Sequence, residues 1–233
     1  MRRELLILDV TAMAGDNVCV AGLDLESRTT IRLNQPQPTR SGLKALGGLT
    51  PGEVIAVDVE PLAQTTRPHV EDHQWNPRSV EKFRRMDNAE ILGALTGTEV
   101  RSLKDAFGEP SRSGKRHNAG WKPGEGERSL ATLRVRYVRQ EEVEAGKIRI
   151  DLRDNERYWH GIPFQDVTVR EHGTSCETCS AGFLDLVRTD FEANACLVRV
   201  GLTRRFPPDE HDDGSACWLQ VTNIFARDRA HFF

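Results

Sequence analysis

Four short stretches in the first sixty residues decide the fold: residues 5–10 (LLILDV), 18–24 (VCVAGLD), 29–33 (TTIRL) and 54–59 (VIAVDV). Each stretch is rich in aliphatic and β-branched residues, which favour β-strands. Turn-forming residues separate the stretches, and the gaps are too short for the crossover helices that parallel strands need. The sequence therefore predicts largely antiparallel strands in a sandwich or a small barrel.

Strand patterns return in the second half of the chain. Residues 130–138 and 148–153 alternate apolar with polar side chains, while residues 196–202 and 217–222 are mostly apolar. The two halves have similar lengths and similar patterns. We therefore expect a mainly β protein made of two small β domains.

The middle of the chain has a different character. Asp87 and Glu90 have the spacing of a helix capping box, and we expect one or two short helices over residues 79–95. Residues 108–127 carry many turn residues and no apolar period, which is typical of a loop or linker. The predicted organisation is a first barrel with a helical tail over 1–100, a basic linker or loop over 101–129 and a second barrel over 130–233.

Composition excludes several classes of protein. The 233 residues include 32 Lys and Arg and 35 Asp and Glu, which gives a formal charge of -3. The net charge of the chain therefore does not favour binding to phosphate groups. Its apolar runs are far shorter than the roughly 20 residues of a membrane helix, and no signal peptide is evident. The five cysteines, an odd number, favour reduced thiols over a disulfide framework. We expect a cytoplasmic protein with no membrane partner.

Several short segments together resemble a known family. They are residues 18–24 with 30–33, residues 67–72, residues 200–204 with Phe206, and residues 217–225. This pattern is similar to the bacterial dual OB-containing domain family, and it covers nearly the whole chain. The resemblance implies two tandem OB-like barrels that bind nucleic acid, as a sensor or adaptor in a defence system. The chain departs from the family at His73, where relatives tend to have Trp, although Trp75 lies two residues further on.

Charge is concentrated between residues 101 and 139, where ten basic residues face four acidic ones, a local charge of +6. A basic loop with an aromatic side chain, next to a basic strand, is typical of a groove for single-stranded nucleic acid. The alternative is a solvated linker with incidental charge. The expected contacts are Arg112, Lys115, Arg116 and Lys122 on phosphate, Trp121 on a base, and Arg134 and Arg136 along the sheet.

A second constellation could hold a metal. In an extended segment, His69, Glu71 and His73 would point the same way, and two imidazoles with one carboxylate can bind a catalytic zinc ion. This arrangement predicts a metal-dependent enzyme that acts on nucleotides or nucleic acid. The alternative, which we favour, is a loop whose side chains bind its own backbone and hold the junction between the domains.

The cysteines suggest a third hypothesis. Cys176 and Cys179 form a CxxC pair, and with His172 they could hold a structural zinc ion in a module that binds a protein partner. Incidental thiols are the alternative. The remaining cysteines, Cys19 and those at 196 and 217, lie in apolar stretches and are expected to be core residues.

Two further segments, residues 155–160 and 204–206, join basic and aromatic side chains. They could extend a binding face or cover the end of a barrel, and we favour the second interpretation. The function that we expect is non-catalytic binding of single-stranded nucleic acid or a nucleotide. The sequence does not choose between RNA, DNA and free nucleotides.

Overall fold

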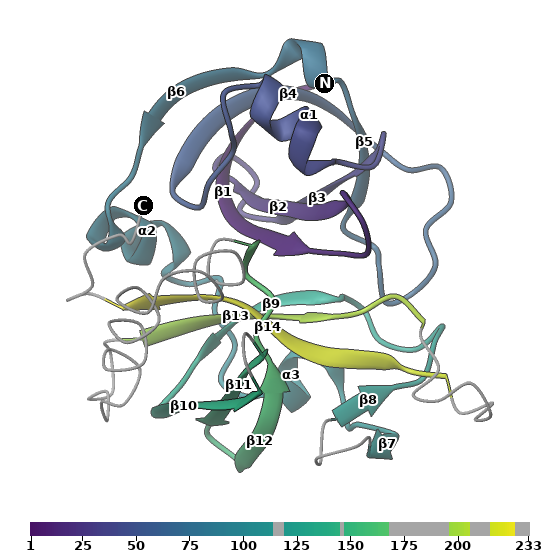
Figure 1. The fold of residues 1–233 in the computed structure, drawn as a ribbon, viewed down its shortest axis with the longest axis vertical. Helices are drawn as coiled ribbons and strands as arrows, with labels where there is room; N and C mark the ends of the chain where they lie inside the picture. Colours follow the sequence, from purple (N-terminus) through teal and green to yellow (C-terminus); the bar gives the residue numbers. More distant parts are fainter. Residues whose placement is uncertain (114–118, 145–146, 168–195, 206–214, 227–233) are drawn as a thin grey trace.

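The computed structural model describes residues 1–113, 119–144, 147–167, 196–205 and 215–226 (Figure 1). Strands dominate these residues, as predicted, and they form two units that stack on each other. In the described part of the chain, no helix is both long enough and apolar enough to span a membrane.

The first unit is a closed five-stranded barrel. Its strands pair in the order β1-β2-β3-β5-β4, and β4 pairs back with β1 to close the barrel. All pairs are antiparallel except β3 with β5, and a short helix lies between β3 and β4. This is the topology of an OB-fold, which confirms the predicted fold class. The elements are β1 (Arg2–Ala12), β2 (Val18–Asp24), β3 (Thr30–Gln35), α1 (Arg40–Ala45), β4 (Glu53–Pro61) and β5 (Asp72–Trp75).

The continuous apolar run in β1 reflects burial on both faces of this strand. Leu5 and Ile7 point into the barrel core, whereas Leu6 and Leu8 pack on the outside against α2 and the second unit. A strand that faces water on one side would alternate apolar with polar residues. A bulge between Ile7 and Asp9 then shifts the register, so that β1 can bend and pair with both β2 and β4.

The segment predicted as helical over residues 79–95 is helical only at its two ends. A 3-10 turn, η1 (Pro77–Ser79), precedes the edge strand β6 (Glu81–Arg85), which pairs with β4. Helix α2 (Asn88–Leu95) follows, and the predicted capping box between Asp87 and Glu90 is present. The helix prediction for 81–85 was wrong because this segment completes the edge of the sheet.

The second unit has the same strand order as the first, with its opening strand broken in two. Strands β10, β11 and β12 form one sheet, and β9 pairs with β13, which pairs with β14. A parallel bridge from Phe164 to Val221 joins the end of β12 to β14. The elements are α3 (Leu103–Phe107), β7 (Arg112–Ser113), β8 (Ala119–Trp121), β9 (Leu130–Arg134), β10 (Tyr137–Glu144), β11 (Lys147–Arg153), β12 (Tyr158–Pro163), β13 (Cys196–Leu202) and β14 (Cys217–Ala226).

The predicted linker over residues 101–129 is, where described, part of the second unit. Strand β8 pairs with the start of β14, and α3 contributes Leu103 and Phe107 to the core of this unit. The many turn residues of this segment therefore join short ordered elements that pack on the second unit.

A buried polar cluster joins the two units. Asp9 of β1 accepts hydrogen bonds from Arg199 of β13, with an Nη2 to Oδ2 distance of 2.7 Å, and from the Thr222 hydroxyl at 2.7 Å. Asp9 and Arg199 are each only 1% exposed. Beside them, the Asn223 side chain donates to the backbone carbonyl of Leu8 at 2.8 Å. Strand β1 is therefore bound directly to β13 and β14.

Candidate nucleic-acid interface

Three outward-facing side chains line up across the sheet of β10, β11 and β12. Arg153 on β11 is paired in register with Tyr137 on β10 and with Tyr158 on β12. Because neighbouring residues of a strand face opposite ways, Leu152 and Trp159 point into the core while Arg153 and Tyr158 point outward. We call Tyr137, Arg153, Tyr158 and His160 the aromatic face.

The rings of the aromatic face lie close enough to form one platform. Tyr158 is 50% exposed, and its ring centroid lies 6.1 Å from that of Tyr137 at an interplanar angle of 69°. His160, two residues along β12, stacks beside Tyr158 at 6.2 Å and 13°. The Arg153 guanidinium carbon lies 5.0 Å from the Tyr158 ring centroid, and this side chain donates to the Tyr158 hydroxyl at 3.3 Å.

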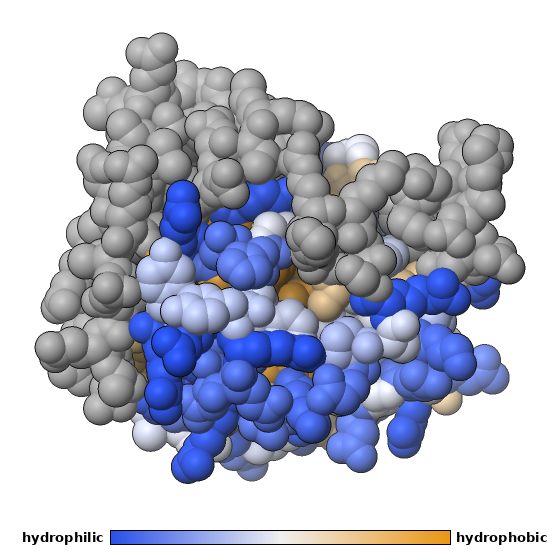
Figure 2. Space-filling model, turned by 90° about the horizontal axis from the view of Figure 1, so that it is seen from below, coloured by the Kyte–Doolittle hydropathy of each residue, from blue (hydrophilic) through white to orange (hydrophobic). Residues whose placement is uncertain are grey.

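Charged groups border the aromatic face. Arg136 is exposed and donates to the Asn155 side chain at 3.0 Å, and Asp151 lies 3.4 Å from His160. Figure 2 views the molecule from the side of the second unit, where the described surface is mainly hydrophilic. Exposed rings beside arginines can stack on nucleobases and neutralise phosphates. This arrangement is therefore chemically suited to single-stranded nucleic acid.

The aromatic side chain that the sequence predicted for stacking is not on the surface. Trp121 is only 3% exposed, and it packs edge-on against Phe107 at 5.6 Å and beside Trp159 at 6.4 Å. Its indole nitrogen donates to the backbone carbonyl of Gly108 at 3.0 Å. Trp121 is a core residue of the second unit, and protein atoms cover the ring that was expected to meet a base.

The predicted phosphate contacts divide into three groups. Arg112 and Arg136 are exposed, whereas Lys122 lies 3.8 Å from Glu125 and Arg134 forms an ion pair with Glu99. Lys115 and Arg116 lie outside the described residues. Of this set, Arg136 borders the aromatic face, because its backbone nitrogen donates to the carbonyl of Arg153 at 2.9 Å.

The predicted metal constellation is not assembled. Residues 68–71 form turns, so His69 and Glu71 do not alternate along one strand as the extended reading required. The Glu71 carboxylate instead accepts hydrogen bonds from the Ser129 nitrogen at 2.7 Å, the Ser129 hydroxyl at 2.9 Å and the Leu130 nitrogen at 3.0 Å. His73 contacts the backbone carbonyl of Glu71 at 2.8 Å. This is the alternative that we favoured, a loop that holds the junction between the units.

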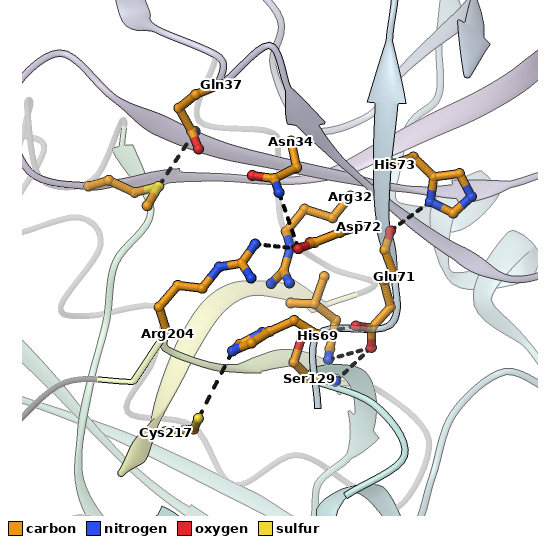
Figure 3. A network of polar contacts seen from close by, with 12 residues as sticks. Arg32, Asn34, Gln37, His69, Glu71, Asp72, His73, Ser129, Arg204 and Cys217 are labelled. Atoms are coloured by element: carbon orange, nitrogen blue, oxygen red, sulfur yellow. Dashed lines mark hydrogen bonds and ion pairs between the residues drawn. The ribbon is translucent and has the colours of Figure 1, made fainter. Parts of the chain in front are cut away.

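His69 is buried at the same junction. Its Nε2 lies 4.0 Å from the Cys217 sulfur (Figure 3). Burial, followed by the charges of Arg32 and Arg204, lowers the pKa of His69 from 6.5 to about 3, so the ring is neutral at pH 7. Among the described residues, no group of three or more His, Cys, Asp or Glu side chains could hold a metal ion.

The remaining cysteine predictions have different outcomes. Cys176 and Cys179, with His172, lie outside the described residues, so a structural zinc site there stays a prediction. Cys196 and Cys217 are buried free thiols at the starts of β13 and β14, as expected for core residues. Cys19, on β2, is partly buried.

Segments that carry the family resemblance meet at the junction. Figure 3 shows Arg32 of β3 and Arg204 after β13 converging on the buried carboxylate of Asp72, at the start of β5. Asp72 is 2% exposed and accepts from Arg32 Nε at 2.5 Å, from Arg204, and from Asn34 at 3.2 Å. The resemblance thus rests partly on residues that join the two units.

Sequence reasoning did not assign Tyr137 or Arg153 to the interface. For residues 155–160, which include Tyr158 and His160, it gave a binding face only as the alternative to covering the end of a barrel. The available signal was the alternation around buried Trp159, which places its two neighbours on the outer face of one strand. The position of Tyr137 opposite Arg153 depends on register, which the sequence of either strand alone does not give.

Comparison with known proteins gives little guidance. No family model and no curated protein matches the chain, so membership of the dual OB-containing domain family stays a prediction. Among solved structures, the Ifi202 HINa domain in complex with 20-bp double-stranded DNA is 9% identical, with a TM-score of 0.35 over 96% of each chain. The tetrameric p202 HIN2 is 8% identical, with a TM-score of 0.31 over 95% of this chain and 91% of that one. Likeness at this level carries no argument, and the OB-like architecture rests on the strand order described above.

Proposed function

We propose that this chain is a binding module for single-stranded nucleic acid and that the aromatic face holds the bases. The observation that carries the proposal is the half-exposed Tyr158 ring, with the Tyr137 and His160 rings on either side and the Arg153 guanidinium over it. Exposed aromatic side chains of this kind make favourable contacts with another flat ring, beyond the effect of the apolar area that is buried. Strands 2 and 3 of an OB-fold often carry such contacts, and β11 and β12 are the equivalent strands of the second unit.

The energetics favour a sequence-tolerant ligand. Every base has a stackable face, and each stacked base contributes about 1–3 kcal/mol. Arg153 and Arg136 can neutralise phosphates, the exposed Arg139 lies on the same side of the sheet opposite Asp151, and the whole chain carries a charge of -3. We therefore expect modest affinity, a shallow salt dependence, and binding of both RNA and DNA.

Duplexes fit this face poorly because their bases are stacked on one another and are not free to meet protein rings. The resemblance to the dual OB-containing domain family adds a sensor or adaptor role in a bacterial defence system to the proposal. The short segments that resemble this family, such as residues 67–72 and 217–225, support that role.

The test is fluorescence anisotropy with a labelled single-stranded 12-mer of RNA or DNA and with the corresponding duplex. Tyr158→Ala should weaken single-strand binding about 5-fold to 150-fold, which corresponds to the loss of one stacked base. The matched control is Phe83→Ala, since Phe83 is a 55% exposed aromatic residue on β6 of the first unit. Equal affinity of Tyr158→Ala and the wild type, or no binding of either single strand at low salt, would contradict the proposal.

A further inference from the structure

A pocket of about 510 Å³ lies between the two units. The first unit contributes the loop after β1 and the outward-facing residues of β2 and β3, including Cys19, Arg32 and Asn34. The second unit contributes Gln220 and residues 202–205. This volume is in the range of small-molecule sites. The pocket is also distinct from the aromatic face, since no residue of that face lines it.

The charged side chains that line this pocket are all positive. The lining includes three arginines, Arg32, Arg204 and Arg205, and no Asp or Glu among the described residues. Asp72 lies behind the lining, where it binds Arg32 and Arg204 and leaves a surplus of positive charge. Burial raises the pKa of the Cys19 thiol above its usual 9.0, so this group adds no opposing negative charge.

Arg32 has an unused donor. Its side chain is only 8% exposed, and its Nε is bound to Asp72, yet its Nη2 makes no hydrogen bond to any described residue. A buried donor without a partner is costly, and native structures usually supply a partner from water, an ion or a ligand. Nη2 itself has almost no accessible surface, so a ligand oxygen in the pocket would be attracted by the charge of Arg32 and would meet the exposed side chains of Arg204 and Arg205 directly.

The rest of the lining fits a ligand larger than phosphate. The Gln220 side-chain amide supplies a donor and an acceptor. The amide nitrogens of Asn34 and Gln37 already donate to Asp72 and Val18, so these two side chains add acceptors that can meet the edge of a nucleobase. Met13, which is 40% exposed, supplies apolar surface for a flat ring. Arginine binds phosphate oxygens through its planar fork, with charge assistance from both partners.

We propose that the pocket between the units binds a nucleotide, with its phosphate on Arg32, Arg204 and Arg205 and its base among the side-chain amides. The phosphate can belong to a free nucleotide or to the phosphorylated end of a strand. This site does not depend on the aromatic face, so either proposal can fail while the other stands.

The test is isothermal titration calorimetry on the full chain with AMP, adenosine and inorganic phosphate. AMP should bind saturably at one site, and adenosine should bind about tenfold more weakly or worse because it lacks the charged group. The double variant Arg204→Gln/Arg205→Gln should weaken AMP binding by a similar factor. The control Arg78→Gln, an exposed arginine on η1 outside the lining, should not.

Changing Arg204 could disturb folding because this side chain is bound to Asp72. A second variant therefore tests the pocket without changing an arginine. Ala14 is exposed and lines the pocket, so Ala14→Trp fills the pocket and leaves every arginine in place. It should abolish AMP binding, whereas Phe83→Ala, outside both the pocket and the aromatic face, should bind AMP like the wild type. No saturable AMP binding by the wild type, equal binding of adenosine, or unchanged binding in both pocket variants would each overturn the proposal.

Oligonucleotides with and without a 5′ phosphate separate the two sources of ligand. A gain from the 5′ phosphate that disappears in Ala14→Trp would assign the pocket to strand ends. Equal binding of the two oligonucleotides, together with AMP binding, would assign it to free nucleotides.

Discussion

Replacing Arg199 with methionine tests what holds the two units together. Arg199 Nε and Nη2 donate to Asp9 at 3.1 and 2.7 Å, and Nη1 donates to the Thr132 hydroxyl at 2.9 Å. Methionine has a similar apolar stem but no donor. In Arg199→Met the Asp9 carboxylate, only 1% exposed, keeps the Thr222 hydroxyl as its hydrogen-bond donor among the described residues. A buried charge is then left without a counter-charge.

The size of the effect follows from this burial. Removing one partner of a buried ion pair costs about 3–5 kcal/mol, because the remaining charge stays desolvated. For a chain of this length, 1 kcal/mol corresponds to about 2–4 °C in Tm, so we expect a fall of about 6–20 °C. The control is Arg2→Met, since Arg2 pairs with Glu81 at the surface, with side-chain exposures of 44% and 65%. An exposed pair of this kind contributes at most about 1 kcal/mol.

Urea unfolding followed by tryptophan fluorescence measures these differences in free energy. The double variant Asp9→Leu/Arg199→Met should be more stable than Arg199→Met alone, because it leaves no unpaired charge. A loss below about 1 kcal/mol in Arg199→Met would refute the reasoning, since it would place Asp9 in contact with water. The reasoning would also be refuted if the double variant lost as much free energy of unfolding as Asp9→Leu and Arg199→Met lose together.

Two further predictions concern stability. The folded chain holds His69 neutral down to about pH 3, whereas the unfolded chain protonates it below about 6.5, so stability should fall as the pH drops through this window by up to about 1.4 kcal/mol per pH unit. His69→Gln should flatten that slope in urea titrations at several pH values, and an unchanged slope would contradict the neutral, buried ring. Gly22→Ala places a Cβ atom 2.7 Å from the backbone carbonyl oxygen of Leu6, so we expect a marked fall in the urea midpoint. Gly93→Ala on α2 meets open space and should gain about 0.5–1 kcal/mol, and equal effects of the two substitutions would argue against the close approach of β1 and β2.

The sequence predicted most of the barrel architecture because local signals and tertiary structure agree there. The run from Leu5 to Leu8 is apolar on both faces, and the strand is buried on both faces. Asp87 and Glu90 predicted the start of a helix, and α2 begins there. Strand propensity, turn residues and helix caps act over a few neighbours, so one sequence is enough to read them.

The failed predictions depend on contacts between distant residues. Trp121 lies in a segment full of turn residues, but its strand is ordered by pairing with β14, and Cys217 is the register partner of Trp121. Similarly, Glu71 is oriented by Ser129, a residue 58 positions away, and not by its neighbours in sequence. A sequence pattern that covers ten residues cannot show which distant segment of the chain will contact a given side chain.

The same topology leads to different surfaces in the two units. In the first unit, the outward side of β2 and β3 carries Arg32, and the second unit packs over it, so a positively charged pocket results between the units. In the second unit, the outward side of β11 and β12 carries Arg153 and Tyr158, and these side chains remain exposed. A flat, exposed face can hold a polymer that continues past it, whereas a pocket between two units is suited to a small ligand or a strand end. The packing of one barrel on the other therefore decides which kind of ligand each equivalent face can accept.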